Sequence, residues 1–300
     1  CPQGRCIRAR TPLSSQTQRE GLQIPPEQQS ETPPEHNCYY YDPLRPNRAL
    51  GEADRYEFAH GTDSLCVYDI DTLDFITEIP VGERPDCHCT SIDNRYVYIA
   101  CKDGLWCIDQ DTLKVVNVVD TGWVFGVNVM PDGETMLVHD AHGGVVVLKG
   151  IADIDRIHVH KRLDMLAGVR GTIGGKGHFI ENGRIYLCNG WDVPRIFAID
   201  LESDYDFDVF LEDPDLTRSD DLVVSADCAR SYSSCYVGEC FVAVTDLARK
   251  KIIARVRTGN GTCGLTMTND RRYVVGGNDQ DDSISVLDAA TDTIAATVSA

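Results

Sequence analysis

The stretch SVLDAATDTIAATV, residues 285–298, decides the fold. An apolar run ends in Asp288, a short polar turn follows, and a second run with alternating character begins at Thr293. Alternation with a period of two and many β-branched residues are typical of half-buried strands. We therefore expect two antiparallel strands joined by a tight turn at this point of the chain.

The same pattern, an apolar strand that ends in Asp, recurs along the chain. The copies are Cys66–Asp69, Trp106–Asp109, Phe197–Asp200, Ala243–Asp246 and Ser285–Asp288, and a sixth copy at 145–148 is followed by Lys149. Neighbouring copies lie about 40 to 51 residues apart, which suits one four-stranded propeller blade per repeat. An aspartate directly after a strand is expected to cap the next turn by accepting backbone hydrogen bonds.

Each copy has similar surroundings. A turn such as Pro131-Asp-Gly133 and a strand such as Tyr273–Gly276 come before it, and an alternating strand that ends in Gly, such as 252–259, comes after it. This order of elements resembles the YVTN-type β-propeller repeat over residues 56–300. The resemblance implies an architecture and leaves activity open, because propellers serve as enzymes, scaffolds and binding modules.

The sequence thus predicts an all-β fold, a β-propeller of six four-stranded blades with seven as the alternative, preceded by an extended, non-globular arm. We place the arm at 1–55 and the propeller at 56–300. The blades are expected at about 56–82, 83–122, 123–163, 164–211, 212–259 and 260–300. The first blade begins at its second strand, so either residues 38–41 of the arm or a strand of another chain must supply its innermost strand.

Charge is divided unevenly between the two parts. Residues 1–55 hold seven Arg and seven acidic residues, so the formal net charge of −19 belongs to residues 56–300. The arm is rich in Pro and poor in large apolar side chains, which predicts a segment held either by its own propeller or by a neighbouring subunit. The residues expected to dock are Arg5, Arg8, Arg10, Tyr39, Tyr40 and Tyr41. We expect a homo-oligomer, a filament or another complex formed through this arm.

Two classes of partner are excluded by composition. A strongly acidic body repels phosphate backbones, which argues against nucleic acid. The apolar runs, such as 145–148, are far too short to cross a bilayer as a helix, so no transmembrane segment is expected.

Cysteine usage points to an oxidising compartment. There are 13 cysteines, and none are arranged as paired Cys-x-x-Cys knuckles, so we interpret most of them as disulfides of an extracellular, cell-surface or periplasmic protein. The candidates are Cys66, Cys107, Cys101, Cys188, Cys87, Cys89, Cys228, Cys235, Cys240 and Cys263. With its polar, Pro-rich tether, Cys1 resembles the lipid-carrying first residue of a processed bacterial lipoprotein; the alternatives are a bridge with Cys6 or an ordinary residue at which the sequence happens to start. Asn260 begins a sequon for N-glycosylation.

Candidate metal ligands follow from the geometry of propellers. The first strand of each blade lines the central channel, where ligands and metals gather. The imidazoles expected at or near this channel are His88, His178, His139 and His60. Imidazole suits transition metals such as copper and zinc. Two acidic loops, 204–215 and 279–282, are candidate Ca²⁺ sites, with solvated loops as the alternative because no EF-hand spacing is present.

Two classes of function remain. We favour a secreted or cell-surface propeller that acts as a binding and self-assembly scaffold, with its arm docking on a partner or a neighbouring subunit. The alternative is an extracellular propeller enzyme, either a metal-dependent oxidoreductase or a lyase or lactonase, with a site of His and Cys in the channel. The sequence contains no nucleophile elbow and no HExxH pair, and it names no ligand or substrate.

Overall fold

The computed structural model describes residues 39–40 and 56–299, with gaps at 131, 167–172, 175–178, 182, 190–193, 217, 220, 226, 237 and 269. The chain divides into two compact units, 1–37 and 38–300, and the described residues belong to the second. The predicted site residues that lie outside the described part are Cys1, Arg5, Arg8, Arg10, Tyr41 and His178.

The first three sheets use the chain from Tyr56 to Leu163. Sheet one holds β2 (Tyr56–His60), β3 (Ser64–Asp69) and β4 (Phe75–Pro80). Sheet two holds β5 (His88–Thr90), β6 (Tyr96–Cys101), β7 (Gly104–Asp109) and β8 (Lys114–Val119). Sheet three holds β9 (Val124–Val129), β10 (Thr135–Asp140), β11 (Gly144–Lys149) and β12 (His158–Leu163), with the 3-10 helix η4 (Ile154–Arg156) before its last strand.

The other three sheets follow in chain order. Sheet four holds β13 (Ile173–Gly174), β14 (Phe179–Glu181), β15 (Arg184–Asn189), β16 (Arg195–Asp200), β17 (Asp206–Glu212) and, from the start of the chain, β1 (Tyr39–Tyr40). After the 3-10 helix η5 (Pro214–Leu216), sheet five holds β18 (Leu222–Val224), β19 (Arg230–Cys235), β20 (Phe241–Asp246) and β21 (Lys251–Arg257). Sheet six holds β22 (Thr262–Met267), β23 (Tyr273–Asn278), β24 (Ser283–Asp288) and β25 (Thr293–Ser299).

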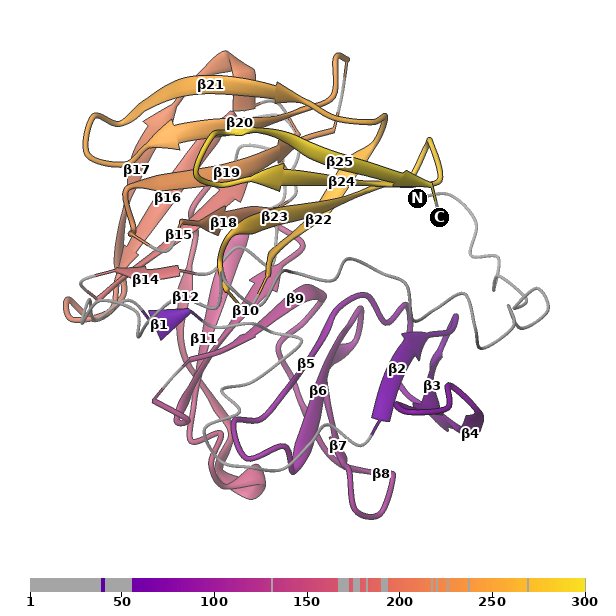
Figure 1. The fold of residues 1–300 in the computed structure, drawn as a ribbon. Coiled ribbons are helices and arrows are strands. Elements are labelled where there is room, and N and C mark those ends of the chain that lie inside the picture. The colour runs from indigo at the N-terminus through magenta and orange to yellow at the C-terminus, as the bar shows by residue number, and fades with distance from the viewer. Residues whose placement is uncertain are drawn as a thin grey trace. The chain divides into compact units, whose positions relative to one another are not determined.

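These six antiparallel sheets are the blades of a β-propeller, as the sequence predicts (Figure 1). Four blades are plain four-stranded sheets, whereas the first has three strands and the fourth has six. Neighbouring blades share apolar clusters; Tyr98 and Val138, for example, belong to one cluster between the second and third blades. The core therefore lies between the blades, where each sheet buries a face against the next.

The turn that ends the third strand of a blade has one recurring structure. In five blades the predicted aspartate, Asp69, Asp109, Asp200, Asp246 or Asp288, accepts hydrogen bonds through Oδ1 from backbone N–H groups two or three residues ahead. Four residues after each aspartate the backbone is left-handed, with φ between 51° and 60°. The expected capping role of these aspartates is confirmed.

The first blade lacks an innermost strand among the described residues. The strand order there is β2-β3-β4, whereas every other blade has a strand inside the one that corresponds to β2. Residues 38–41 are one predicted source of the missing strand, but β1 pairs with β14 of the fourth blade, through Tyr39 opposite Ile180 and Tyr40 opposite Phe179. The assignment of this segment to the first blade is therefore wrong. In the fourth blade the innermost position is divided between β13 and β14, which both pair with β15. The segment β1 pairs with the short outer edge of β14.

Burial separates the two end blades from the middle ones. All six residues of β6 are buried, and so are five of the six in β10 and in β19, because both faces of these sheets are covered. In β23 of the sixth blade, buried and half-buried residues alternate strictly. Within the described residues, no strand of the first blade makes an extended contact with the sixth blade. Among the described residues, each end blade therefore has one face that no other blade covers.

Among the described residues, no helix is long and apolar enough to cross a membrane.

Candidate functional site

Two of the four predicted histidines meet between the first two blades. His60 ends β2, and His88 begins β5 of the next blade. Their nearest ring nitrogens, His60 Nε2 and His88 Nδ1, are 2.8 Å apart, and the rings stand nearly perpendicular at 87°. This contact is exposed to solvent. The structure thus brings together imidazoles that are 28 residues apart in sequence.

Neighbouring rings fix the orientation of the pair. Phe58, two residues before His60 and therefore on the same face of β2, packs edge-on against His88 with ring centroids 5.8 Å apart. Phe58 is buried in the apolar cluster that joins the first two blades. His88 also lies beside the fully buried Ile99, its partner across the ladder on the same face of the sheet. The two imidazoles are therefore presented by rigid strands.

The other two predicted ligands do not join this pair. His139 is fully buried inside the third blade, where its Nε2 lies 2.9 Å from Asn128 Nδ2. Its ring covers Gly126, at which an added Cβ would come within 2.8 Å of His139 Nδ1. His178 lies outside the described residues. In the described part of the chain, no group of three or more His, Cys, Asp or Glu side chains is arranged to hold a metal.

The acidic loops are occupied by contacts with the protein's own donors. Asp204 binds His160 at 3.2 Å and Lys161 at 3.2 Å, and these contacts hold the pKa of its carboxyl below the usual value. Asp215 pairs with Arg255. In the second loop, Asp281 accepts hydrogen bonds from both nitrogens of Asn260, which likewise lower its pKa. These three carboxylates thus make structural contacts, and calcium binding at either loop stays a prediction.

The glycosylation candidate Asn260 takes part in that same contact. Its side-chain amide nitrogen, the atom that would carry a glycan, donates to Asp281 Oδ1 at 2.8 Å. The hydroxyl of Thr262, the third residue of the sequon, is buried and bonded to Asn278 Oδ1 at 2.7 Å. The sequon therefore forms part of a closed polar cluster at the entry to the sixth blade. Glycosylation at this position stays a prediction.

The cysteines differ from the expectation. The structure carries nine of the ten disulfide candidates as thiols, namely Cys66, Cys87, Cys89, Cys101, Cys107, Cys188, Cys235, Cys240 and Cys263. Cys228 alone among the ten is disulfide-bonded. Burial raises the pKa of the Cys101, Cys107 and Cys235 thiols to about 12, so these groups stay protonated and act as small apolar core residues. The expectation that most of the candidates form disulfides is therefore not supported, and the oxidising compartment stays a prediction.

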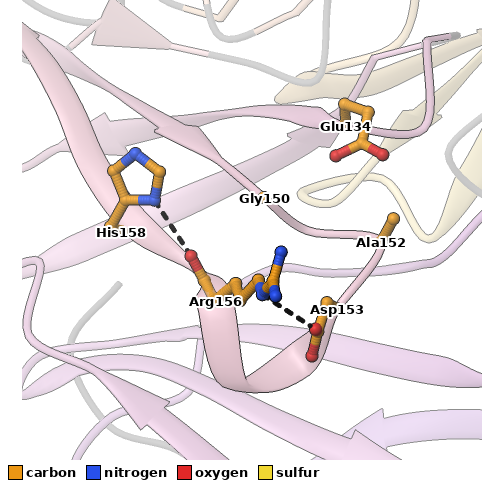
Figure 2. Close-up of a pocket in the computed structure, with 6 residues that line it drawn as sticks. All are labelled: Glu134, Gly150, Ala152, Asp153, Arg156 and His158. Carbon is orange, nitrogen blue, oxygen red and sulfur yellow. Dashed lines mark hydrogen bonds and ion pairs between the residues drawn. The ribbon is translucent and has the colours of Figure 1, made fainter.

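A hollow of about 510 Å³ opens beside η4 on the third blade (Figure 2). It is lined by Glu134, Gly150, Ala152, Asp153, Arg156 and His158. The Arg156 guanidinium is paired with Asp153 at 3.2 Å, and His158 Nδ1 lies 2.9 Å from the carbonyl oxygen of Arg156. The Arg156 guanidinium is thus paired with the N-cap residue of its own 3-10 helix rather than directed at the centre of the hollow. We place the candidate site elsewhere.

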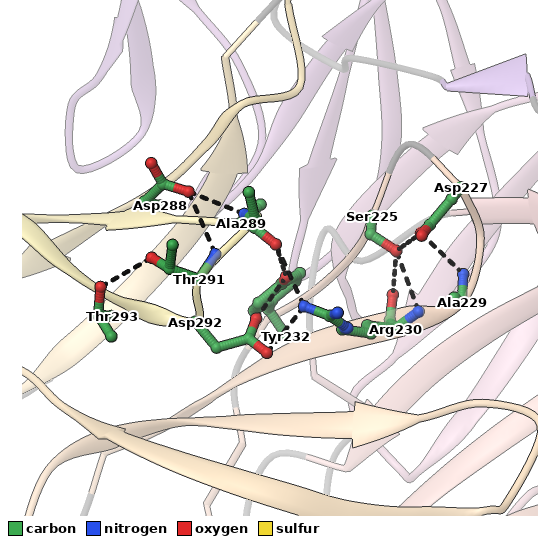
Figure 3. A network of polar contacts seen from close by, with 11 residues as sticks. Ser225, Asp227, Ala229, Arg230, Tyr232, Asp288, Ala289, Thr291, Asp292 and Thr293 are labelled. Carbon is green, nitrogen blue, oxygen red and sulfur yellow. Dashed lines mark hydrogen bonds and ion pairs between the residues drawn. The ribbon is translucent and has the colours of Figure 1, made fainter. Parts of the chain in front are cut away.

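The polar joint between the fifth and sixth blades was not anticipated from the sequence. Figure 3 shows Arg230 and Tyr232 of β19 reaching the turn after β24. Arg230 Nη1 pairs with Asp292 Oδ2 at 2.8 Å, and the Tyr232 hydroxyl lies 2.9 Å from Asp292 Oδ1 and 3.1 Å from the carbonyl oxygen of Ala289. Burial, followed by the charge of Asp292, raises the pKa of Tyr232 above its usual value.

An equivalent tyrosine ties the second blade to the third. Tyr98 and Tyr232 are each the third residue of the second strand of a blade. The Tyr98 hydroxyl donates to the carbonyl oxygen of Ile151, in the loop after β11, at 3.1 Å. The sequence signal that could have indicated this contact is the recurrence of Tyr at the third position of the second strand, which also holds Tyr186 in β15. Only the register of the strands shows that the position faces the next blade.

The fold is similar to those of two solved structures. Hydrazine Synthase of Kuenenia stuttgartiensis matches with a TM-score of 0.63 and 14% sequence identity, over 82% of this chain and 83% of that chain. Dihydro-heme d1 dehydrogenase NirN in complex with DHE matches with a TM-score of 0.61 and 19% identity, over 90% of this chain and 62% of that chain. No family model and no curated protein matches the sequence. At these identities the likeness shows the β-propeller fold alone, and the YVTN resemblance stays a prediction.

Proposed function

We propose that this propeller is a self-assembling binding scaffold whose copies join head to tail. The sixth blade of one copy would pack against the first blade of the next, with the N-terminal arm reinforcing the contact. The observation that carries this proposal is the alternation of burial along β23, which contrasts with the complete burial of β6. A sheet with one uncovered apolar face is stabilised when a second sheet covers it.

The uncovered face of the sixth blade is built like a face that the chain covers elsewhere. We call Val275, Ile284, Val286 and Val298 the sixth-blade face. Val275 pairs with Val286 in the register that Tyr98 and Cys107 use in the second blade. Tyr98 and Cys107 are fully buried against the third blade, whereas Ile284 and Val298 are 37% and 47% exposed. Because the equivalent residues of the second blade pack against the next blade, we expect the sixth-blade face to pack against another blade as well.

The first blade offers the complementary surface. Its side away from the second blade carries Tyr68 and Phe75, whose rings contact each other edge-on at 5.8 Å. Phe75 is 57% exposed. Because the sixth-blade face and this first-blade face are different surfaces, their contact is heterologous and joins copies in an open filament or a closed ring. A second copy of the chain is therefore the occupant that both surfaces fit.

Charge supports a contribution from the arm. Residues 1–55 have no formal net charge and carry seven Arg, whereas residues 56–300 carry the full −19. Acidic bodies repel each other on approach, so a segment that brings Arg5, Arg8 and Arg10 to the neighbouring body lowers that repulsion. Salt screens exposed charge pairs. Assembly through the contacts of these arginines with the neighbouring body is therefore expected to weaken as salt is added.

Sedimentation of the full chain at several concentrations tests the proposal. We expect the weight-average mass to rise with concentration, and we expect Ile284→Lys and Phe75→Lys each to return the protein to a monomer. Either charge would have to be buried without a partner in the interface. Ile284→Lys keeps an intact first-blade face, and Phe75→Lys keeps an intact sixth-blade face. A mixture of the two variants should therefore form dimers through these two faces and no larger assemblies.

The chain provides a matched control. Val118 of β8 in the second blade is an apolar strand residue that is 45% exposed, close to the values at the proposed interface. Val118→Lys should leave assembly unchanged. A wild-type protein that is monomeric at every concentration would overturn the proposal, and so would a loss of assembly in Val118→Lys equal to that in Ile284→Lys.

A further inference from the structure

The histidine pair joins two blades through a hydrogen bond between imidazoles. His60 and His88 come from different blades, and each presents a ring nitrogen to the other across 2.8 Å at an exposed position. Exposed contacts of this kind add little to stability. Both rings are nevertheless held in place, His88 by the buried Phe58 and by its ladder position opposite Ile99.

The spacing is close to that of two imidazoles bound to one ion. Metal–nitrogen bonds of about 2.0–2.1 Å, at angles between square and tetrahedral, place two ligand nitrogens about 2.9–3.4 Å apart. The observed 2.8 Å needs to widen by only a few tenths of an ångström to reach this range. Both ring nitrogens must also turn from each other toward the ion, which requires rotation of the two side chains at the exposed ends of their strands.

The surroundings favour a cation. The body carries a net charge of −19, which raises the local concentration of cations at its surface. Asp86 lies two residues before His88 and accepts a contact from Cys87 Sγ at 3.6 Å. Imidazole nitrogens select nickel, copper and zinc over calcium and magnesium, which prefer oxygen.

We propose that His60 and His88 bind one divalent transition-metal ion between the first and second blades. Two protein ligands leave coordination positions open, so the ion can accept water or an incoming donor group. The site would also cross-link the first blade, which has three strands, to its complete neighbour. Because both ligands lie in the described body, the proposal does not depend on self-assembly.

Calorimetric titration of the reduced full chain with Ni²⁺ at pH 7.5 tests this inference. We expect one site per chain, and we expect His60→Ala and His88→Ala each to lower its affinity at least tenfold, because one remaining imidazole binds weakly. Affinity should also fall as the pH is lowered toward 5.5, since imidazole binds metal only in its neutral form.

Matched variants separate this site from other donors. His158 and His160 are two residues apart on β12 and both exposed, yet each contacts a different partner, the carbonyl oxygen of Arg156 and the carboxylate of Asp204. His158→Ala and Cys87→Ser should each leave the affinity within twofold of wild type. Retention of the Ni²⁺ site in both His60→Ala and His88→Ala would overturn the proposal, as would its loss in His158→Ala.

Thermal unfolding gives a second readout that does not rely on heat of binding. A ligand that binds only the folded chain raises the melting temperature by an amount that grows with the ratio of its concentration to its dissociation constant. Saturating Ni²⁺ should raise the melting temperature of the wild type and of His158→Ala, and should leave that of His60→Asn unchanged. Asn keeps a polar side chain at the end of β2, so a folded His60→Asn that still responds to Ni²⁺ would contradict the assignment of His60 as a ligand.

Discussion

The turns that follow the third strand in the first and sixth blades have the same backbone and different side chains. In both, the capping aspartate is followed four residues later by a left-handed residue, Leu73 at φ 60° in the first blade and Asp292 at φ 53° in the sixth. Leu73 is 61% exposed. Asp292 instead reaches across to Arg230 and Tyr232 of the fifth blade (Figure 3).

This difference separates two roles of the repeat. The aspartate cap and the left-handed residue determine the shape of the turn, because their hydrogen bonds lie within the turn itself. The side chain at the left-handed position determines whether the turn also joins two blades. A repeat can therefore keep its fold while its joints vary, and the joint can be altered without changing the turn.

Removal of the sixth-blade joint should have the largest effect. Asp292→Ala loses the ion pair with Arg230 and the hydrogen bond from Tyr232, and both former partners are then left partly buried. Hydrogen bonds to charged groups contribute about 1.5–3 kcal/mol each, and the partial exposure of Arg230 reduces the total, so we expect the free energy of unfolding to fall by about 2–3 kcal/mol. Urea unfolding measures this.

Asp292→Asn is the control for the previous variant, since it keeps an acceptor for Tyr232 and removes the charge. Its free energy of unfolding should lie between that of the wild type and that of Asp292→Ala. If Asp292→Ala unfolds at the urea concentration of the wild type, the joint contributes nothing to stability and the comparison of the two turns fails.

Substitution of either interblade tyrosine should lower the free energy of unfolding by less than Asp292→Ala does. Tyr232→Phe loses a hydrogen bond to a carboxylate, whereas Tyr98→Phe loses one to the neutral carbonyl of Ile151. We expect a loss of about 2 kcal/mol for Tyr232→Phe and about 1 kcal/mol for Tyr98→Phe. In the background of Asp292→Ala the effect of Tyr232→Phe should shrink, and additive effects of the two changes would show that the hydroxyl and the carboxylate are not coupled.

The smallest expected effect has the opposite sign. Leu73→Gly should raise the free energy of unfolding by about 0.5–1 kcal/mol, because a leucine is strained at positive φ and its exposed side chain contributes little packing. At the equivalent position, Asp292→Gly should destabilise the protein because it loses the joint. Thermal unfolding of the two variants therefore gives shifts of opposite direction, and shifts of the same direction would refute the division of roles.

The sequence was sufficient for the parts of the fold that depend on local chemistry. An aspartate after an apolar strand caps its own turn wherever the strand lies, so Asp69 and Asp288 were predictable one by one. The spacing of the copies then predicted the blades. The same logic failed for residues 38–41, because nothing in a short aromatic segment states which of several sheet edges it will pair with.

The candidate site was predictable only in outline. Propeller geometry placed His60 and His88 near the channel, but their contact depends on Phe58 and on the angle between two blades. His139 carried the same sequence signal and is buried against Gly126 and Asn128. The cysteines misled for a related reason, since a residue that is favoured in buried strands looks the same in sequence whether it packs as a thiol or forms a disulfide.

The three-stranded first blade is expected to resist mechanical force less well than the sixth blade. Its inner edge is open among the described residues, and it is joined to its neighbour through one apolar cluster and the contact of His60 with His88. The sixth blade is complete and is held by the ion pair of Arg230 with Asp292. A force that pulls the first and the sixth blades apart is therefore expected to separate the first blade from the second before it separates the sixth from the fifth.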